Sequence, residues 1–433
     1  MDLIVLALFC ASLLICILFD ASILYALIAG FFIFTTYGLY KNIPLKELLC
    51  EAAKSVKTVK NILITFMLIG MMTALWRASG TIPFIVSYSS KLITPDIFLL
   101  MTFILNCMVS FLIGTSFGTA ATMGVICATM GATMNISPVM VGGAVLSGCF
   151  WGDRCSPIST SALLVSELTK TNIYDNIKQM FRTSFIPTTI SCLIYLFIGF
   201  NLDNSGEIIN LEVLFGTEFT LHILTLLPAI TILALATLKV NVKKSMLVSI
   251  LISVPICIFI QKIPFTDVIH LTFWGYYARN AELFDIINGG GIVSMLRVAA
   301  IVCISSSYSG LFKKTGLLNN IKSIIASLNN KTNTFITTLC TSALADMIAC
   351  NQTLAILLTH QLCDEIHTDR KKFAIILEDT VVITAPLVPW SIASGAPLTS
   401  IGAPSASVLF AFYLIVLPLW GLLNSLKQKN DIK

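Results

Sequence analysis

The sequence predicts an all-α polytopic membrane protein made of two inverted-topology repeats of about seven segments, with paired broken helices. Three observations predict it: scarce charge, a long series of apolar segments, and matched interruptions in two of them. Of the 433 residues, 56% are hydrophobic and 11% are charged, and the mean hydropathy is +0.90. Soluble domains carry about 25% charged residues, so this chain has too few to cover a water-soluble fold. Soluble enzymes and nucleic-acid binders are therefore excluded.

A transmembrane helix needs about 20 mostly apolar residues, and two sets of seven such segments follow along the chain. The first set lies near 3–19, 21–40, 61–77, 96–113, 117–133, 139–166 and 183–200. The second set lies near 219–238, 245–262, 291–312, 333–349, 351–366, 373–400 and 405–425. We expect a first membrane repeat over 1–200, an external acidic linker over 201–218, and a second repeat with a short basic tail over 219–433. The shorter segments are either full crossings or re-entrant hairpins.

The distribution of basic residues predicts the orientation, because cytoplasmic loops are enriched in Lys and Arg. If each segment crosses once from a cytoplasmic N-terminus, the loops 41–60, 167–182, 239–244, 313–332, 367–372 and the tail 427–433 all face the cytoplasm. They hold 21 of the 27 Lys and Arg residues. The opposite face keeps Lys91, Lys262 and Arg279, and its loop 201–218 has Asp203, Glu207, Glu212 and Glu218 without a base. Both termini are expected in the cytoplasm, with contact between the loop 41–60 and anionic lipid.

The sixth segment of each set is too long and is interrupted near its centre. The interruptions contain Gly152 and Pro157 in the first set, and Pro386 and Pro389 in the second. The junction between the fourth and fifth segments is also polar in both sets: Thr115, Ser116 and Thr119 in one, and Asp346, Asn351 and Gln352 in the other. Because seven is odd, the second set enters the membrane from the opposite side, and paired broken helices in an inverted repeat are typical of the binding site of a secondary transporter. The alternative is that proline and glycine only kink ordinary helices.

Few ionisable side chains fall within the predicted spans, and each costs a few kcal/mol if it faces lipid. They are Arg77, Asp153, Arg154, Arg297, Asp346, Glu378 and Asp379. Arg77 is close enough to a helix end to reach water, and the alternative for Glu378 and Asp379, which are two turns into their span, is that they simply reach cytoplasmic water. Asp153 and Arg154 lie in the interruption itself, at mid-depth, so they are the best candidates for function.

The interruptions supply the oxygen ligands that hard cations such as Na⁺ prefer. The candidate ligands for a cation or a proton are Asp153, Ser156, Ser159, Thr160, Ser161, Glu378, Asp379 and Thr384, with carbonyls freed by Pro157 and Pro386. A carboxylate held away from water can bind either species, and competition for one such site would produce exchange. Arg154 and Arg297 are alternatives for pairing with a carboxylate, in the protein or on an organic substrate.

These motifs resemble the NhaC-type sodium/proton antiporters, a family that also includes malate–lactate exchangers. The resemblance rests on Gly114-Thr115-Ser116-Phe117-Gly118-Thr119, on Gly152-Asp153-Arg154-Cys155-Ser156-Pro157-Ile158-Ser159, and on Leu377-Glu378-Asp379 followed by Pro386-Leu387-Val388-Pro389-Trp390. It runs from about residue 60 to 425. It implies an ion-coupled antiporter of the cytoplasmic membrane that carries Na⁺ and H⁺, with no resident cofactor and no structural metal; a homodimer is left open.

The chain departs from the family pattern at three places. Thr160 and Ser161 follow the Ser-Pro-x-Ser run where the family has Asp and Thr, Val381 and Val382 replace small or hydroxyl residues, and Ser391 stands where Asn is common. The missing carboxylate at 160 removes one candidate cation ligand. Sodium/proton exchange is therefore the primary prediction, and an ion-coupled carrier or exchanger of a small carboxylate or amino acid is the alternative.

Two other classes fit less well. The run Gly114–Gly118 matches the pattern of a hydrolase nucleophile elbow, but that elbow requires a preceding strand, and here it joins two apolar segments. A channel would need an open pore, for which paired broken helices are a poor fit. We therefore expect a transporter without enzymatic activity.

Overall fold

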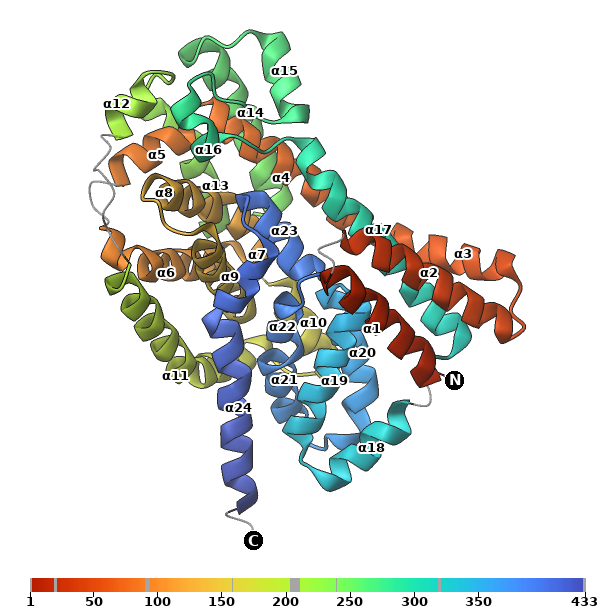
Figure 1. Ribbon diagram of the computed structural model, residues 1–433. Coiled ribbons are helices and arrows are strands. Elements are labelled where there is room, and N and C mark those ends of the chain that lie inside the picture. The colour runs from red at the N-terminus through yellow and green to blue at the C-terminus, as the bar shows by residue number, and fades with distance from the viewer. Residues whose placement is uncertain are drawn as a thin grey trace.

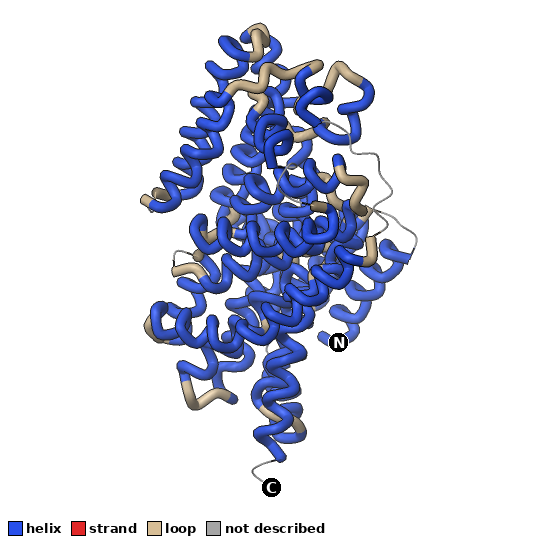
Figure 2. The backbone as a smooth tube through the Cα atoms, turned by 90° about the vertical axis from the view of Figure 1, so that its left-hand side faces the viewer, coloured by secondary structure: helices blue, strands red, loops and turns tan. Residues whose placement is uncertain are grey.

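The computed structural model is helical, with no strand in the residues it describes, which are 2–18, 22–89, 94–157, 159–202, 211–238, 240–317 and 321–430 (Figures 1 and 2). Lys91 and the linker acids Asp203 and Glu207 lie outside these ranges. In Figure 1, α12, α15 and α16 lie at one end of the molecule, and α18 and the C-terminal end of α24 lie at the other.

The first half of the chain forms helices close to the predicted segments. They are α1 (Asp2–Leu18), α2 (Ile23–Tyr40), α3 (Leu45–Thr58), α4 (Lys60–Ala78), α5 (Thr81–Ser89), α6 (Pro95–Ile113), α7 (Ser116–Thr119), η1 (Ala120–Gly124), α8 (Val125–Thr133), α9 (Pro138–Cys155), α10 (Thr160–Thr169) and α11 (Ile173–Phe200). The segments α7, η1 and α8 form one continuous helix with a π-turn at η1.

The second half begins with the short helix α12 (Leu211–Gly216). Its helices are η2 (Ile223–Leu226), α13 (Leu227–Thr237), α14 (Val242–Pro255), η3 (Ile256–Ile260), α15 (Phe265–Trp274), η4 (Ala281–Leu283), α16 (Phe284–Ile287), η5 (Ile292–Met295), α17 (Leu296–Thr315), α18 (Ile321–Lys331), α19 (Thr334–Ala349), α20 (Gln352–Cys363), η6 (Asp364–Ile366), α21 (Arg370–Asp379), α22 (Val381–Thr384), η7 (Ala385–Leu387), α23 (Ile392–Ile401), η8 (Ser405–Phe410) and α24 (Phe412–Asn430).

Several helices are long and apolar enough to cross a bilayer. These are the helices over 60–78, 95–113, 173–200, 242–260 and 292–315, and the bent pair over 370–401 adds a sixth. Five further apolar helices are shorter, between 10 and 17 residues. At 1.5 Å per residue, a helix such as α20, with 12 residues, extends about 18 Å. It does not cross a hydrocarbon core of about 30 Å by itself. The chain is thus a polytopic membrane protein in which several of the described apolar helices are shorter than a full crossing.

The first predicted interruption lies between α9 and α10. Ser156 is extended, with φ −86° and ψ 134°, because a residue that precedes proline is disfavoured in a helix. Ser159 then caps α10 by accepting hydrogen bonds from the backbone N–H groups of Ser161 and Ala162. The proline ends one helix and the serine begins the next, so the broken helix is encoded locally.

The second predicted interruption separates α22 from α23 across η7, and the helix axis bends there by 53°. Val388 is extended before Pro389, and Ser391 caps α23. The structure adds a break that the sequence analysis missed. Thr380 leaves the helical region (φ −116°, ψ −93°) directly after Glu378 and Asp379, so both acids lie in the last turn of α21.

The two halves share the positions of their helix ends. The caps of the broken helices are separated by the same number of residues in three pairs, Ser137 with Asp369, Ser159 with Ser391, and Lys170 with Gly402. Each half also has a left-handed residue between its fourth and fifth segments, Gly114 and Cys350. The packing between the halves is also reciprocal. Helices α2 and α3 of the first half contact α17 of the second, and α14 and α15 of the second half contact α4 of the first.

The basic loop 41–60 forms the amphipathic helix α3. Leu48 and Ala52 are buried on a helix that packs against α17. Glu47 forms an ion pair with Lys314 at 2.8 Å, and Lys54 pairs with Glu51 at 2.7 Å. The basic side chains thus lie outside the apolar spans.

A buried histidine lies in the turn between α20 and α21. The His367 ring is 7% exposed, its Nε2 lies 2.9 Å from Thr338 Oγ1, and it stacks on Phe373 at 4.2 Å. Burial, helped by Lys372 and Arg370 and opposed by Asp364, lowers the pKa of His367 to about 4. The folded protein therefore holds this imidazole neutral.

We expect the stability of the protein to fall as the pH decreases from about 6.5 towards 4, because the unfolded chain binds a proton there and the folded chain does not. His367→Gln removes this titration. Between pH 7 and pH 5, the wild type should lose about 1–2 kcal/mol more than the variant, measured by thermal unfolding in detergent. His270→Gln, at an exposed position on α15, is the matched control. An equal loss in the wild type and in His367→Gln would contradict the prediction.

Candidate functional site

Asp153 lies in the last turn of α9, at the first interruption, and is 4% exposed. Its Oδ1 accepts a hydrogen bond from Ser159 Oγ at 2.7 Å. Ser159 Oγ lies 2.9 Å from Ser161 Oγ, and the hydroxyl and backbone N–H of Ser116 face the same carboxylate. Residues from both predicted polar regions, 115–119 and 152–161, therefore meet at one acid.

Two helix beginnings surround this acid. Ser159 is the N-cap of α10, and Ser116 is the first residue of the helix that runs through α7, η1 and α8. Helix N-termini carry a partial positive charge that stabilises an anion. The carboxylate and its neighbouring hydroxyls form a compact group of oxygens, which is the type of ligand that Na⁺ prefers.

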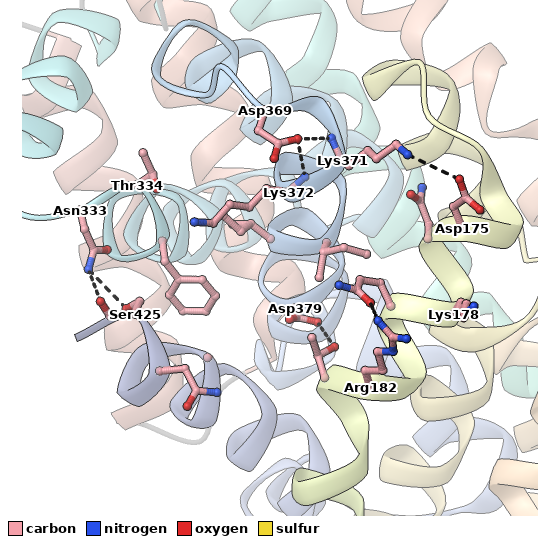
Figure 3. A pocket seen from close by; sticks show the side chains of 18 of the residues that line it. Asp175, Lys178, Arg182, Asn333, Thr334, Asp369, Lys371, Lys372, Asp379 and Ser425 are labelled. Atoms are coloured by element: carbon pink, nitrogen blue, oxygen red, sulfur yellow. Dashed lines mark hydrogen bonds and ion pairs between the residues drawn. The ribbon is translucent and has the colours of Figure 1, made fainter. Parts of the chain in front are cut away.

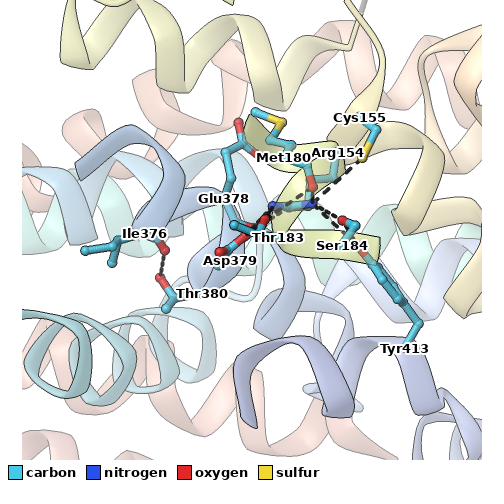
Figure 4. Close-up of polar contacts among 10 residues, drawn as sticks. All are labelled: Arg154, Cys155, Met180, Thr183, Ser184, Ile376, Glu378, Asp379, Thr380 and Tyr413. Atoms are coloured by element: carbon cyan, nitrogen blue, oxygen red, sulfur yellow. Dashed lines mark hydrogen bonds and ion pairs between the residues drawn. The ribbon is translucent and has the colours of Figure 1, made fainter. Parts of the chain in front are cut away.

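Arg154 points to another group of residues and is fully buried. Its guanidinium forms an ion pair with Asp379 on α21 and donates to Ser184 on α11 (Figure 4). It also donates to the Thr183 hydroxyl at 2.8 Å and to the Glu378 carbonyl at 3.2 Å. The Tyr413 hydroxyl on α24 lies 2.8 Å from Ser184 and completes the network. Arg154 thus joins α9, α11, α21 and α24.

Of the two predicted uses of Arg154, the structure has the ion pair within the protein. Arg297 does not join it. Arg297 lies in the first turn of α17 and is exposed, and its predicted role in an ion pair or in substrate binding stays a prediction. Arg77, expected to reach water, is instead 6% exposed and donates to the Thr73 carbonyl at 3.0 Å.

Glu378 is completely buried beside this network. Neither of its carboxylate oxygens has a hydrogen-bond partner in the part of the chain that the structure describes. Glu378 lies within electrostatic reach of Arg154, Asp153 and Asp379. In Figure 4 the carboxylates of Glu378 and Asp379 point in different directions. The alternative that Glu378 reaches cytoplasmic water is therefore wrong.

The second interruption has its own buried acid. Asp346, in the last turn of α19, is 1% exposed and accepts a hydrogen bond from Thr384 Oγ1 at 2.5 Å. Asn351 caps α20 through Thr353, and Gln352 donates to the Val382 carbonyl at 2.9 Å. These predicted junction residues hold α19, α20 and α22 together.

The remaining predicted residues have local positions. Ser156 Oγ donates to the Phe111 carbonyl at 2.8 Å, and Thr119 Oγ1 donates to the Thr115 carbonyl at 2.9 Å. A Cβ at Gly152 would lie 2.3 Å from Ser110 Cβ, so glycine permits the close approach of α9 to α6. Thr160, a candidate cation ligand, is exposed on the first turn of α10, whereas Asp153 is buried.

A cavity of about 960 Å³ lies beside the Arg154 network (Figure 3). Its lining comes from α11, α19, α21 and α24 and includes Asp175, Lys178, Arg182, Asn333, Lys371, Lys372, Asp379 and Ser425. At its rim, Lys371 Nζ lies 3.7 Å from an Asp175 carboxylate oxygen, and both side chains are well exposed. Asp379 therefore lies between this cavity and the buried Glu378.

Sequence reasoning missed the residues on α11 and α24 that hold Arg154. Thr183, Ser184 and Tyr413 are hydroxyl-bearing residues in or beside predicted spans. Polar side chains in such segments usually face the protein interior, and this signal would have identified them as contacts of a buried charge.

The comparisons with known proteins decide the family. The model of the Na⁺/H⁺ antiporter family matches residues 1–167 and 148–422. The chain belongs to the Na⁺/H⁺ antiporter family. This confirms the resemblance inferred from the motifs, and this antiporter is a multi-pass membrane transporter.

Three relatives illustrate the range of the family. The antiporter is 27% identical to the malate-2H⁺/Na⁺-lactate antiporter of Bacillus subtilis, over 86% of this chain and 82% of that protein. It is 26% identical to the Na⁺/H⁺ antiporter NhaC of Alkalihalophilus pseudofirmus, over 90% and 87%. It is 25% identical to the arginine/ornithine antiporter ArcD of Halobacterium salinarum, over 81% and 75%.

Removing Arg154 should destabilise the antiporter strongly, because Asp379 would remain as an unpaired buried charge. We expect Arg154→Met to cost about 3–5 kcal/mol, and the double variant Arg154→Met/Asp379→Leu to cost less than the sum of its two single changes. Chemical unfolding in detergent measures both. Arg297→Met, on an exposed side chain, is the control, with a change within about 0.5 kcal/mol. If Arg154→Met and Arg297→Met were equally stable, the ion pair between Arg154 and Asp379 would not stabilise the packing of these helices.

Proposed function

We propose that this protein is a sodium/proton antiporter in which Na⁺ and H⁺ compete to neutralise the negative charge of two neighbouring buried carboxylates, Asp153 and Glu378. The observation that carries the proposal is an imbalance of buried charge. Glu378 lies within electrostatic reach of both Asp153 and Asp379, and Arg154 forms its ion pair with Asp379. Since an uncompensated charge inside a membrane is expensive, the other two carboxylates need a cation or a proton.

The two unpaired acids have different surroundings, which suits different tasks. Asp153 has the hydroxyl groups of Ser159, Ser161 and Ser116 around it, so we assign it the cation. Glu378 has no donor or other ligand in the described residues, so we assign it the proton. The two groups repel each other when both are ionised. Neutralising one of them, by Na⁺ on Asp153 or by a proton on Glu378, therefore favours release of the ion bound to the other.

The organic-substrate alternative has less support. It gave Arg154 or Arg297 the role of binding a substrate carboxylate, but Arg154 is held by Asp379 and Arg297 is exposed on α17. Two relatives are named as transporters of malate and lactate or of arginine and ornithine. Those names describe the substrates of the relatives.

We also propose that the transport cycle uses two inverted repeats, 1–200 and 219–433, joined by an external linker over 201–218. The matched caps and the reciprocal packing of α2 on α17 and of α14 on α4 support a repeat. Both termini are then cytoplasmic, and the cavity lies at the cytoplasmic ends of α11, α19 and α21. This arrangement corresponds to an inward-facing state in a cycle of alternating access.

The primary test uses everted membrane vesicles that hold a pH gradient and a fluorescent pH probe. Addition of Na⁺ should release the quenched fluorescence as protons leave. No response to Na⁺, Li⁺ or K⁺, together with a response to malate or to an amino acid, would overturn sodium/proton exchange and favour the alternative.

Asp153→Asn should abolish sodium-driven proton movement while the protein still inserts, because the amide removes the anionic ligand. The expected loss is at least about tenfold, measured in the same vesicles with the amount of inserted protein determined by immunoblot. Asp267→Asn, which neutralises an exposed acid on α15, is the matched control and should leave transport unchanged. Full activity of Asp153→Asn would refute the assignment of this site.

Glu378→Gln should separate the two halves of the exchange. The glutamine cannot take up a proton, whereas the Asp153 group remains intact. We expect proteoliposomes with this variant to retain exchange of radiolabelled Na⁺ for unlabelled Na⁺ but to lose exchange of Na⁺ for H⁺. If Na⁺/H⁺ exchange persists, Glu378 is not the proton carrier.

A further inference from the structure

A second buried acid outside the Asp153 group is only half satisfied. Asp346 is 1% exposed, and its Oδ2 accepts the Thr384 hydroxyl at 2.5 Å. Its Oδ1 is buried without a hydrogen-bond partner among the described residues. An unsatisfied buried polar atom costs about 1–3 kcal/mol, so this oxygen needs a ligand.

Several oxygens gather at the end of α22. Thr384 Oγ1 lies 3.0 Å from the Thr380 carbonyl and 2.5 Å from Asp346 Oδ2. A hydroxyl has one proton to donate and two lone pairs to offer, so Thr384 can bridge to an ion that the carboxylate holds. Carboxylate, hydroxyl and carbonyl oxygens form a ligand set for a hard cation.

Asp346 in the second half corresponds to Ser110 in the first half, because each lies four residues before the left-handed residue that ends its helix. In α19, the backbone N–H of the left-handed residue Cys350 bonds to the Asp346 carbonyl at 3.2 Å. In α6, the N–H of the left-handed residue Gly114 bonds to the Ser110 carbonyl at 2.8 Å. Both side chains face the broken helix of their own half, since Ser110 Oγ donates to the Cys149 carbonyl on α9 and Asp346 contacts Thr384.

A permanently protonated Asp346 is the simplest alternative, and the contacts argue against it. A proton on Oδ2 would be donated to Thr384 Oγ1, and Thr384 would then donate to the Thr380 carbonyl, but Oδ1 would still have no hydrogen-bond partner among the described residues. A bound cation would satisfy that oxygen.

We propose that Asp346 and Thr384 form a second Na⁺-binding site, at the second helix interruption. The inference rests on the proposed function, because it assigns the same cation to a second place. The helix α22 packs against both α19 and α9, so an ion at Asp346 stabilises the contact between the broken helices of the two halves. The second ion thereby couples their movement to the loading of Asp153.

Equilibrium binding of radiolabelled Na⁺ to the purified protein in detergent tests the second site. The wild type and Asp267→Asn should bind two Na⁺ ions per chain. Asp346→Asn and Asp153→Asn should each bind one. Thr384→Val should weaken one of the two affinities by about tenfold, and Thr384→Ser, which restores the hydroxyl, should recover it. Thr384→Val keeps the size and shape of the side chain, so it serves where Asp346→Asn does not yield a monodisperse protein.

The outcomes separate this site from the proposed antiport. If Asp346→Asn binds two Na⁺ ions with unchanged affinity, the second site is overturned. It is also overturned if Asp346→Asn alters the pH profile of transport while the number of bound ions stays unchanged. Sodium-driven proton movement by the wild type tests the antiport itself. If that movement is absent while the two binding sites respond as expected, the proposed exchange fails and the second cation site stands.

Discussion

The ion pair between Arg154 and Asp379 is the interaction on which the centre of the structure depends. It joins the end of the first broken helix, α9, to the end of α21, the first part of the second. Thr183, Ser184 and Tyr413 add α11 and α24. A buried ion pair offsets its desolvation only when further hydrogen bonds satisfy both partners, and here hydroxyls from two other helices supply them.

This pairing gives neighbouring residues different roles. Asp153 and Arg154 are consecutive on α9, and Glu378 and Asp379 are consecutive on α21, yet one member of each pair enters the ion pair and the other does not. Beside the ion pair, the carboxylates of Asp153 and Glu378 are buried and form no ion pair of their own within the described residues. In the proposed function, these carboxylates take up the transported cation and proton, because no ion pair within the described residues already neutralises them.

Local sequence predicted most of the helices and both interruptions. Apolar runs, prolines and capping serines act within a few residues of one another, so the break at Ser156–Ser159 and the cap at Ser391 follow from the chain alone. The extra break at Thr380 was not predicted, because no proline or glycine marks it. Lengths were predicted less well, and helices such as α20 are too short to cross the bilayer alone.

The sequence by itself determined that this is a membrane transporter, since scarce charge, basic loops and family motifs are all properties of residue order. It also determined which few acids could matter. Only the tertiary structure decided their partners: Arg154 with Asp379, Asp153 with Ser159, Asp346 with Thr384, and Glu378 with none of the described residues. The physical reason is distance along the chain. Arg154 and Asp379 come from different halves, and a hydrogen bond or ion pair between such residues depends on packing that no local pattern encodes.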